Sequence, residues 1–475
     1  MKLSLRQKNQ ESDTRSQRII LVILAFATLL PSLAISGVNL TLPILAEQLG
    51  VSFSQVQWLT IAYLLSLTST LVIAGKIIDA KGQKKVFIIG LLIFIGASIA
   101  LGNNRDLYHL IFFRAIQGVG GAMLIAVNMA IASKTFEKNE VGSAIGLIGS
   151  MSAVGTGAGP VVASFLIEYW SWQSVFLINI PIAATTLALA LCFLPENETK
   201  ASQSINNKAA LLFFLTIAIT TTALKTTESG LSSFTLILIM FSVGMLAAFV
   251  SYERQTGQPL FNTGMLKEPP FVISLFTNFL ISSVVMISLI IGPFYLTLAL
   301  QLSIVETGFV MIASPVTVAV FAFLSGKLTN KINLDNLVLV GITFITFGAV
   351  WMTQITVTDG TIGYLIGLVI MGAGYATFTS ANNTLTMLKV DSSNKGLFSG
   401  ILGLSRNLGL MIGATLSSNL YSFITGLSRQ VEPSPILLSD GVNMVYYVAL
   451  LVLLAALSIQ FFNKKTNDKS HVKAA

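Results

Sequence analysis

Residues 142–164 read GSAIGLIGSMSAVGTGAGPVVAS, and residues 396–418 read GLFSGILGLSRNLGLMIGATLSS. At the offset of 254 positions between them (142 to 396), five glycines and one serine coincide. The same offset pairs three more residues: Gly118 with Gly372, Gly120 with Gly374 and Asn128 with Asn382. An offset of 251 pairs Gly75, Lys76 and Gly90 with Gly326, Lys327 and Gly341. We interpret this as a duplication in parallel orientation, the plan of transporters that rock two halves around a central site. The alternative is the general abundance of glycine in membrane helices, which does not predict a matched asparagine.

The composition requires lipid as the solvent. The 475 residues are 54% hydrophobic and 10% charged, whereas soluble domains carry about a quarter charged residues. Apolar runs of about 20 residues, enough to cross a bilayer, recur from Ile19 almost to the C-terminus. They predict an all-α membrane protein with about fourteen transmembrane helices. The predicted order is a polar N-terminal tail (1–18), a six-helix bundle (19–194), a linker (195–208), two additional helices (209–252), a loop (253–270), a second six-helix bundle (271–463) and a polar tail (464–475).

The basic residues predict the orientation. An even number of spans places both termini on one side, and with the termini in the cytoplasm most of the 28 Lys and Arg residues fall in cytoplasmic segments. Arg105, Lys225 and Arg429 are expected outside. The first apolar run is expected to be a retained span and not a cleaved signal peptide. The net charge of +8 is scattered between the spans, so we expect no nucleic-acid partner.

Several function classes find no support in the residues. The single cysteine and two histidines predict no internal disulfide and no metal site. The sequence has no phosphate-binding Gly-x-x-x-x-Gly-Lys-Ser/Thr loop and no paired catalytic acids, so neither an ATP-driven pump nor an enzyme is expected. We also expect no cofactor and a monomeric chain.

Between the second and third spans, residues 75–85 read GKIIDAKGQKK. Gly75 and Gly82 allow a tight turn, and Asp79 among bases such as Lys84 is suited to pair across two moving halves. A loop that is basic only because it is cytoplasmic is the alternative. The stretch resembles the signature loop of the major facilitator superfamily, although Ala80 and Gln83 stand where that family usually has basic residues.

The fourth span carries Arg114, followed by Gln117 and Gly118. A guanidinium about two turns inside the membrane costs on the order of 2.5–3.5 kcal/mol on insertion scales, so a polar interior partner is expected. The alternative is that Arg114 extends to the outer membrane interface. The segment resembles the Arg-x-x-Gln-Gly motif of the same superfamily, and this resemblance implies a role for Arg114 in proton coupling.

The fifth span is rich in small residues, with Gly155, Gly159 and Pro160 at its centre. Small residues let helix backbones approach closely, and a proline bends the helix. This segment resembles the antiporter motif of exporters, with Ala163 and Ser164 in place of a usual glycine pair. Residues 170–181, 306–315 and 400–413 are similar to the fourteen-helix drug:proton antiporter branch. The resemblance covers nearly the whole chain and implies the major facilitator fold and a multi-pass protein of the bacterial inner membrane.

The resemblance breaks in the first helix, where Ala34 replaces an aspartate of that branch. No acidic residue lies near the middle of a predicted span. The interior instead offers amides and one guanidinium as candidates for a substrate cavity: Asn39, Asn128, Asn382, Asn383, Arg406 and Asn407. We predict a cavity for neutral or anionic amphipathic solutes, with Arg406 as charge partner. The alternatives are that Arg406 binds backbone carbonyls and that the asparagines cross-link helices.

These observations predict a secondary transporter that exports small amphipathic compounds by alternating access, in exchange for protons. A proton-independent uniporter or organic-anion carrier is the alternative within transport. A receptor on the same fold that does not transport is the alternative outside it.

Overall fold

The computed structural model describes residues 2–136, 141–196, 206–227, 232–257, 260, 269–329, 331–388, 395–427 and 433–474. Within these residues the chain forms helices joined by short connections and no strand. Thirteen of the helical segments are long and apolar enough to cross a membrane. α16 is a further helix of 31 residues, about 46 Å long at 1.5 Å per residue. The predicted all-helical membrane fold is confirmed.

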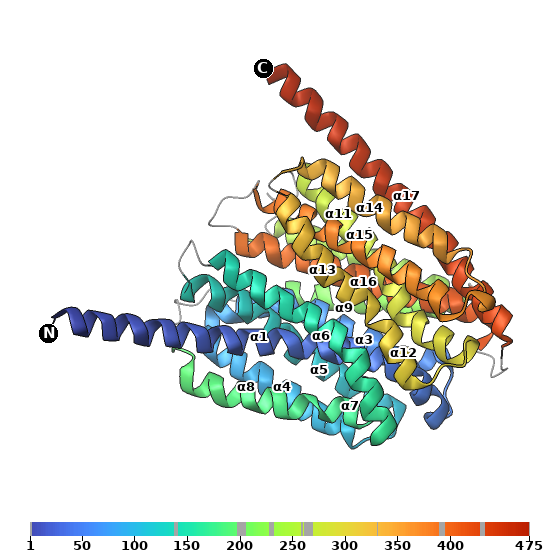
Figure 1. Cartoon of the computed structure of the whole chain (residues 1–475), viewed down its shortest axis with the longest axis horizontal. Coiled ribbons are helices and arrows are strands. Elements are labelled where there is room, and N and C mark those ends of the chain that lie inside the picture. The colour runs from blue at the N-terminus through green and yellow to red at the C-terminus, as the bar shows by residue number, and fades with distance from the viewer. Residues whose placement is uncertain are drawn as a thin grey trace.

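The first block contains α1 (Lys2–Leu49), the short α2 (Phe53–Val56) leading into α3 (Trp58–Lys81), α4 (Gln83–Gly102), α5 (Leu107–Thr135), α6 (Val141–Tyr169), and α7 (Ser174–Leu177) leading into α8 (Asn179–Phe193). Two additional helices follow, α9 (Asn207–Thr226) and α10 (Ser233–Gln255). The second block contains α11 (Pro269–Phe294) continued by η3 (Tyr295–Ala299), α12 (Ile304–Met311) with α13 (Ala313–Leu328), α14 (Leu334–Met352), η4 (Val357–Asp359) with α15 (Gly360–Leu388), α16 (Lys395–Thr425) and α17 (Pro435–Ala474). The two predicted polar tails are helical continuations of α1 and α17 (Figure 1).

The duplication is confirmed by the contacts of its glycines. A Cβ atom at Gly120 would lie 2.8 Å from the Gly90 carbonyl oxygen and 2.9 Å from the Phe94 nitrogen. A Cβ atom at the matching Gly374 would lie 2.7 Å from the carbonyl oxygen of Gly341 and 2.6 Å from the nitrogen of Ile345. Gly341 and Ile345 follow Gly90 and Phe94 in the sequence by 251 positions each. The same two helix pairs, α4–α5 and α14–α15, therefore pack backbone to backbone at equivalent glycines.

The neighbouring helix pair repeats as well. Gly118 of α5 abuts the Tyr63 carbonyl oxygen of α3, and its counterpart Gly372 of α15 abuts the Ser314 carbonyl oxygen of α13. Tyr63 and Ser314 are again 251 positions apart. Because a side chain at either glycine would push the helices apart, the small residues fix the interhelical distance in both halves.

The halves meet most closely at one end of the molecule. Both termini project from the same end (Figure 1), here called the terminal end, and the opposite end is called the distal end. Near the distal end, the ring of Phe53 lies 4.4 Å from that of Phe294 and 5.8 Å from that of Tyr421. Toward the terminal end, Gly75, Gly149, Gly326 and Gly400 have no atom within 4 Å of an added Cβ. Aromatic side chains of the two halves are thus in contact near the distal end, while these four glycines toward the terminal end have open space beside them.

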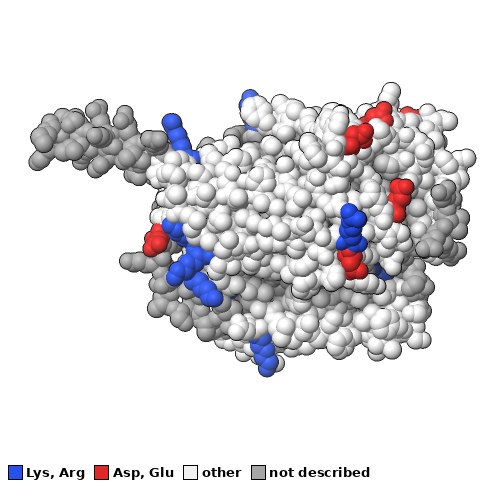
Figure 2. All heavy atoms as spheres, turned by 90° about the horizontal axis from the view of Figure 1, so that it is seen from below, with Lys and Arg blue, Asp and Glu red and all other residues white. Residues whose placement is uncertain are grey.

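The outer surface fits a lipid environment. Large apolar side chains such as Phe234, Met240 and Phe241 on α10 are exposed. On the face shown in Figure 2, uncharged atoms cover the middle of the molecule, and most Lys and Arg residues lie toward the terminal end. This distribution agrees with the predicted cytoplasmic termini.

One predicted connection is shorter than expected. Of residues 75–85, those up to Lys81 continue α3, and α4 begins at Gln83. Only Gly82 lies between the helices, with φ 85°, a conformation that side chains disfavour. Gly82 is therefore the turn residue, whereas Gly75 is helical and does not bend the chain.

Candidate functional site

The Arg114 guanidinium is completely buried inside the first half. Its Nε donates to the Leu59 carbonyl oxygen at 3.0 Å, and Nη1 donates to Gln117 Oε1 at 2.6 Å and to the Ala34 carbonyl oxygen at 3.4 Å. The guanidinium carbon lies 4.2 Å from the centre of the Tyr63 ring. Arg114 therefore joins α5 to α1 and α3, and the alternative that it extends to the membrane interface is wrong.

This cluster is polar but has no carboxylate among its described contacts. Gln117 extends the hydrogen-bond network to α4, because its Nε2 donates to Oγ of Ser98 on that helix at 2.9 Å. Arg114 Nη2 is buried without a hydrogen-bond partner among the described residues. The charge is thus held by carbonyl oxygens, one amide and one aromatic face, which is a cation–π arrangement. Such a site holds a positive charge in place but offers no described acid for proton exchange.

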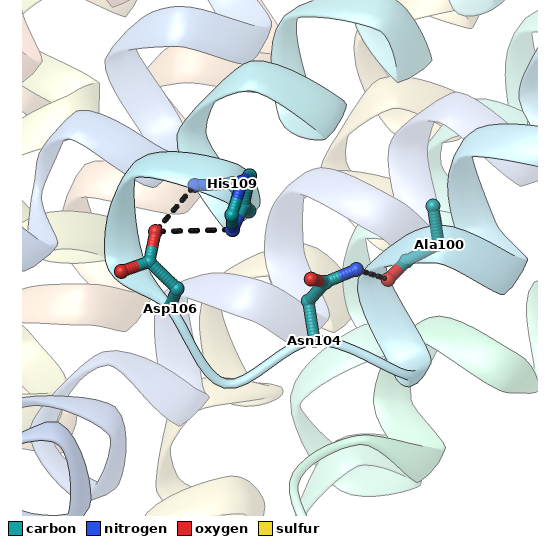
Figure 3. A network of polar contacts seen from close by, with 4 residues as sticks. All are labelled: Ala100, Asn104, Asp106 and His109. Carbon is teal, nitrogen blue, oxygen red and sulfur yellow. Dashed lines mark hydrogen bonds and ion pairs between the residues drawn. The ribbon is translucent and has the colours of Figure 1, made fainter.

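The turn between α4 and α5 fixes the start of the helix that carries Arg114. Asp106 is the N-cap of α5, and its Oδ1 accepts a hydrogen bond from the His109 backbone nitrogen at 3.0 Å (Figure 3). The same oxygen lies 3.3 Å from His109 Nδ1, and Asn104 Nδ2 donates to the Ala100 carbonyl oxygen at 2.7 Å. Both ends of the turn are therefore tied to the helices they connect, which sets the start of α5 about two turns before Arg114.

The switch-loop residues lie at the terminal end of the first half. Lys84 Nζ donates to the Leu191 carbonyl oxygen at 3.2 Å, near the end of α8, where a cation complements the helix dipole. A cavity of about 290 Å³ adjoins Lys84 and is bordered by residues 16–20 of α1, the start of α4 and the ends of α5 and α8. The Asp79 side chain lies outside the described residues, so its predicted pairing across the halves stays a prediction.

The glycine-rich helix α6 of the first half contacts both α1 of its own half and α12 of the second half. On one side, a Cβ at Gly155 would lie 2.7 Å from the Leu29 carbonyl oxygen, and Gly159 abuts Ser36, both on α1. On the other side, a Cβ at Gly308 of α12 would lie 2.9 Å from the Pro160 carbonyl oxygen. The three predicted motif residues therefore bring α6 close to α1 and to the second half at once.

Three of the six predicted cavity residues cross-link helices within one half. Asn39 Oδ1 accepts from Thr60 Oγ1 at 2.7 Å, and Asn128 Nδ2 donates to Thr28 Oγ1 at 2.7 Å. In the second half, Ser274 Oγ donates to Asn382 Oδ1 at 2.8 Å. All three asparagines are buried. In this conformation they fit the helix-joining alternative better than a cavity lining.

Arg406 differs from these residues because its side chain is exposed, although it lies within the long helix α16. It follows the start of α16 by 11 residues, which is about 17 Å along a helix of about 46 Å. Ser405 donates to the Leu275 carbonyl oxygen of α11, and a Cβ atom added at Gly403 would lie 4.0 Å from Leu71 Cδ2 of α3. By helical geometry Arg406 falls between the face of α16 that contacts α11 of the second half and the face that contacts α3 of the first half.

The remaining two predicted cavity residues are Asn407 and Asn383. Asn407 is buried beside Arg406, and Asn383 on α15 is exposed next to the buried Asn382. No hydrogen bond or ion pair holds the Arg406 guanidinium within the described residues, so the alternative in which it binds backbone carbonyls does not apply to this conformation. Arg406 is the candidate contact for a solute.

Two features were not foreseen from the sequence. Tyr63, which covers the Arg114 guanidinium, gave no signal because a tyrosine in an apolar run is usually a core residue. Lys225, expected outside the membrane, is instead 5% exposed and packs against α16. Its position in the last turn of an apolar helix is a signal that favours a structural role over a free loop charge.

Comparison with known sequences identifies relatives along nearly the whole chain. The riboflavin transporter RibZ of Clostridioides difficile is 27% identical over 452 residues, covering 95% of this chain and 98% of RibZ. The uncharacterized transporter YebQ of Escherichia coli is 30% identical over 383 residues, 80% of this chain and 83% of YebQ. The multidrug resistance protein Stp of Mycobacterium tuberculosis is 25% identical over 423 residues, 88% of this chain and 78% of Stp.

Solved structures agree on the fold. A POT family transporter in complex with 5-aminolevulinic acid superposes with a TM-score of 0.69 at 14% identity, covering 93% of this chain and 96% of that chain. The nucleoside transporter NupG superposes with a TM-score of 0.66 at 12% identity, covering 93% and 99%. The profile of the Major Facilitator Superfamily matches residues 24–414. With its duplicated six-helix blocks and these matches, the chain belongs to the major facilitator superfamily.

Proposed function

We propose that this transporter exports small amphipathic compounds, neutral or anionic, by alternating access and in exchange for protons. We place it in the bacterial inner membrane with both termini in the cytoplasm. Names of similar proteins that refer to riboflavin and to multidrug resistance support an organic substrate. The observation that carries the charge preference is Arg406, an exposed guanidinium within α16 that has no hydrogen bond or ion pair among the described residues. We propose that it faces the solute path between the halves.

The arrangement of the halves supports alternating access. Phe53, Phe294 and Tyr421 close the distal end, and the glycines toward the terminal end have open space around them. With cytoplasmic termini, this is the inward-facing arrangement, in which a solute reaches Arg406 from the cytoplasm. Export then requires the distal aromatic contacts to separate while the terminal end closes.

The charge preference is tested with purified protein in liposomes. Matched planar amphiphiles with an anionic, a neutral or a cationic substituent are compared for the native chain, Arg406→Ala and the exposed control Arg105→Ala. We expect Arg406→Ala to reduce export of the anion by about tenfold, the effect of losing one hydrogen bond to a charge, with neutral export retained. Good export of cations by the native chain, together with a silent Arg406→Ala, contradicts the proposal.

Proton exchange is tested separately because no carboxylate contacts Arg114 or Arg406 among the described residues. An imposed pH gradient, acidic outside, should accelerate export in the same liposomes. Transport that ignores the gradient excludes proton exchange but leaves transport intact.

The second candidate is an organic-anion carrier without proton exchange, which the unpaired Arg406 favours. Such a carrier responds to membrane potential with about 2.3 kcal/mol per unit charge and 100 mV. Reversing the potential in liposomes of equal pH then reverses the direction of net anion movement, which distinguishes the two candidates.

A further inference from the structure

The additional helix α9 lies across the boundary between the two halves. It packs against α3 of the first half, α16 of the second half and its hairpin partner α10. Near its distal end, Lys225 is buried with only 5% of its surface exposed. A buried ammonium group needs hydrogen-bond acceptors, because desolvation without them is costly.

The acceptors come from α16. Lys225 Nζ donates to Asn419 Oδ1 at 3.0 Å and to Ser418 Oγ at 3.3 Å. The Asn419 amide also binds α9 in the other direction. Its Nδ2 donates to the Leu224 carbonyl oxygen at 2.6 Å and to Thr227 Oγ1 at 3.2 Å. Asn419 thus binds both the Lys225 ammonium and the carbonyl end of α9, and Lys225 also complements the α9 dipole.

A further contact extends the attachment along the helix. Thr221 Oγ1 lies 3.5 Å from Met411 Sδ, about two turns before Asn419 on α16. If α9 moved away from α16, both a buried ammonium and helix-end carbonyls would lose their described partners at once. Movement of α9 along α3 does not break these hydrogen bonds.

We infer that Lys225 and Asn419 are positioning residues that fasten the α9–α10 hairpin to the second half, so that the hairpin travels with α16 and slides past α3 during transport. The inference rests on the alternating access proposed above. It makes the additional helices part of one moving body and not a third, independent one.

Distance measurements between spin labels test the inference without any substrate. In a Cys192→Ser background, labels replace three exposed lysines at the terminal end: Lys208 of the hairpin, Lys85 of the first half and Lys331 of the second half. The pair at 85 and 331 reports opening between the halves, which Phe53→Ala and a pH series are used to shift. We expect the 208–331 distance to stay constant while the 208–85 distance follows the opening. A 208–331 distance that changes as much as the 85–331 distance overturns the inference.

Variants connect the fastening to transport. Lys225→Met should broaden the 208–331 distance distribution and lower the initial transport rate by about tenfold, the effect of a lost buried charged hydrogen bond. Lys225→Arg, which keeps the charge and donors, should restore both, and the exposed control Arg105→Met, at a position that carries no label, should change neither. A narrow 208–331 distribution in folded Lys225→Met contradicts the inference. If labels behave as expected and no solute is transported, the proposed function fails and the fastening stands.

Discussion

Arg114 shows how a membrane interior holds a charge with no described carboxylate beside it. Its donors reach the Leu59 and Ala34 carbonyl oxygens and Gln117, and the Tyr63 ring covers one face. Carbonyl oxygens of neighbouring helices supply partial negative charge without adding a titratable group. The position is therefore stable as a permanent cation and depends on a fork-shaped donor, which lysine cannot replace.

Adding an acid next to this cation should cost little stability in the native chain and much more when the cation is removed. We expect Ala34→Asp to be tolerated in the native chain, since Arg114 Nη1 lies 3.4 Å from the carbonyl oxygen of residue 34. In Arg114→Met the same aspartate is a buried carboxylate without that partner, which costs on the order of 3–5 kcal/mol. Thermal unfolding of the four chains of this double-mutant cycle measures the coupling. Equal losses from Ala34→Asp in both backgrounds would contradict the contact.

The residue types foretold this site only in part. Arg114 stood out because a charge within an apolar run needs an interior partner, and its burial agrees with that expectation. Its actual partners are mostly backbone carbonyl oxygens, which no sequence pattern distinguishes. The asparagines were equally visible, but whether an amide joins helices or faces a cavity depends on helix rotation, which periodicity resolves too coarsely.

At the scale of helices, glycine spacing determines which elements touch. The contacts of Gly118 with Tyr63 and of Gly372 with Ser314 place α5 on α3 and α15 on α13 in the same way. This part was predictable because close backbone approach requires small residues at fixed positions. The one-residue turn at Gly82 was not, since the positively charged stretch around it looks like a loop although most of it is helical.

These contacts predict a graded response to added methyl groups. Gly118→Ala should destabilise most, because its Cβ would overlap the Tyr63 carbonyl oxygen, while Gly372→Ala meets Ser314 at 3.0 Å and should cost less. Gly96→Ala is the matched control in α4, with no atom within 4 Å, and should be neutral or slightly stabilising through helix propensity. Thermal unfolding in detergent gives the order. A loss for Gly96→Ala as large as that for Gly118→Ala would refute the assignment of these contacts.

For the whole molecule, the aromatic contact between the halves near the distal end is the feature that an alternating-access cycle would have to break. Phe53 is 3% exposed and its ring packs edge-on against Phe294 of the other half. Aromatic pairs of this kind contribute about 0.5–1.5 kcal/mol beyond burial. That is enough to shift a balanced two-state equilibrium by roughly twofold to tenfold.

Removing this ring should open the distal end more often. We expect Phe53→Ala to increase the labelling rate of a cysteine at the buried Thr60 by an impermeant thiol reagent applied from outside, by about twofold to tenfold. Cys192→Ser provides the background. The comparison is Phe309→Ala, which removes an exposed aromatic ring that lies 6.0 Å from the ring of Phe165 in the first half. Unchanged labelling of Thr60→Cys in Phe53→Ala would show that Phe53 does not hold the distal end closed.

The matched packing of the two halves conceals an electrical asymmetry. The offset that pairs their glycines places Leu368 opposite Arg114 and Ser152 opposite Arg406, so neither guanidinium has a twin. Helix shapes repeat, but each half carries its cation on a different helix and at a different burial. A solute with one acidic end would consequently be oriented within the carrier. Its acidic end would be attracted to the half that contains Arg406, and its apolar end would face the other half.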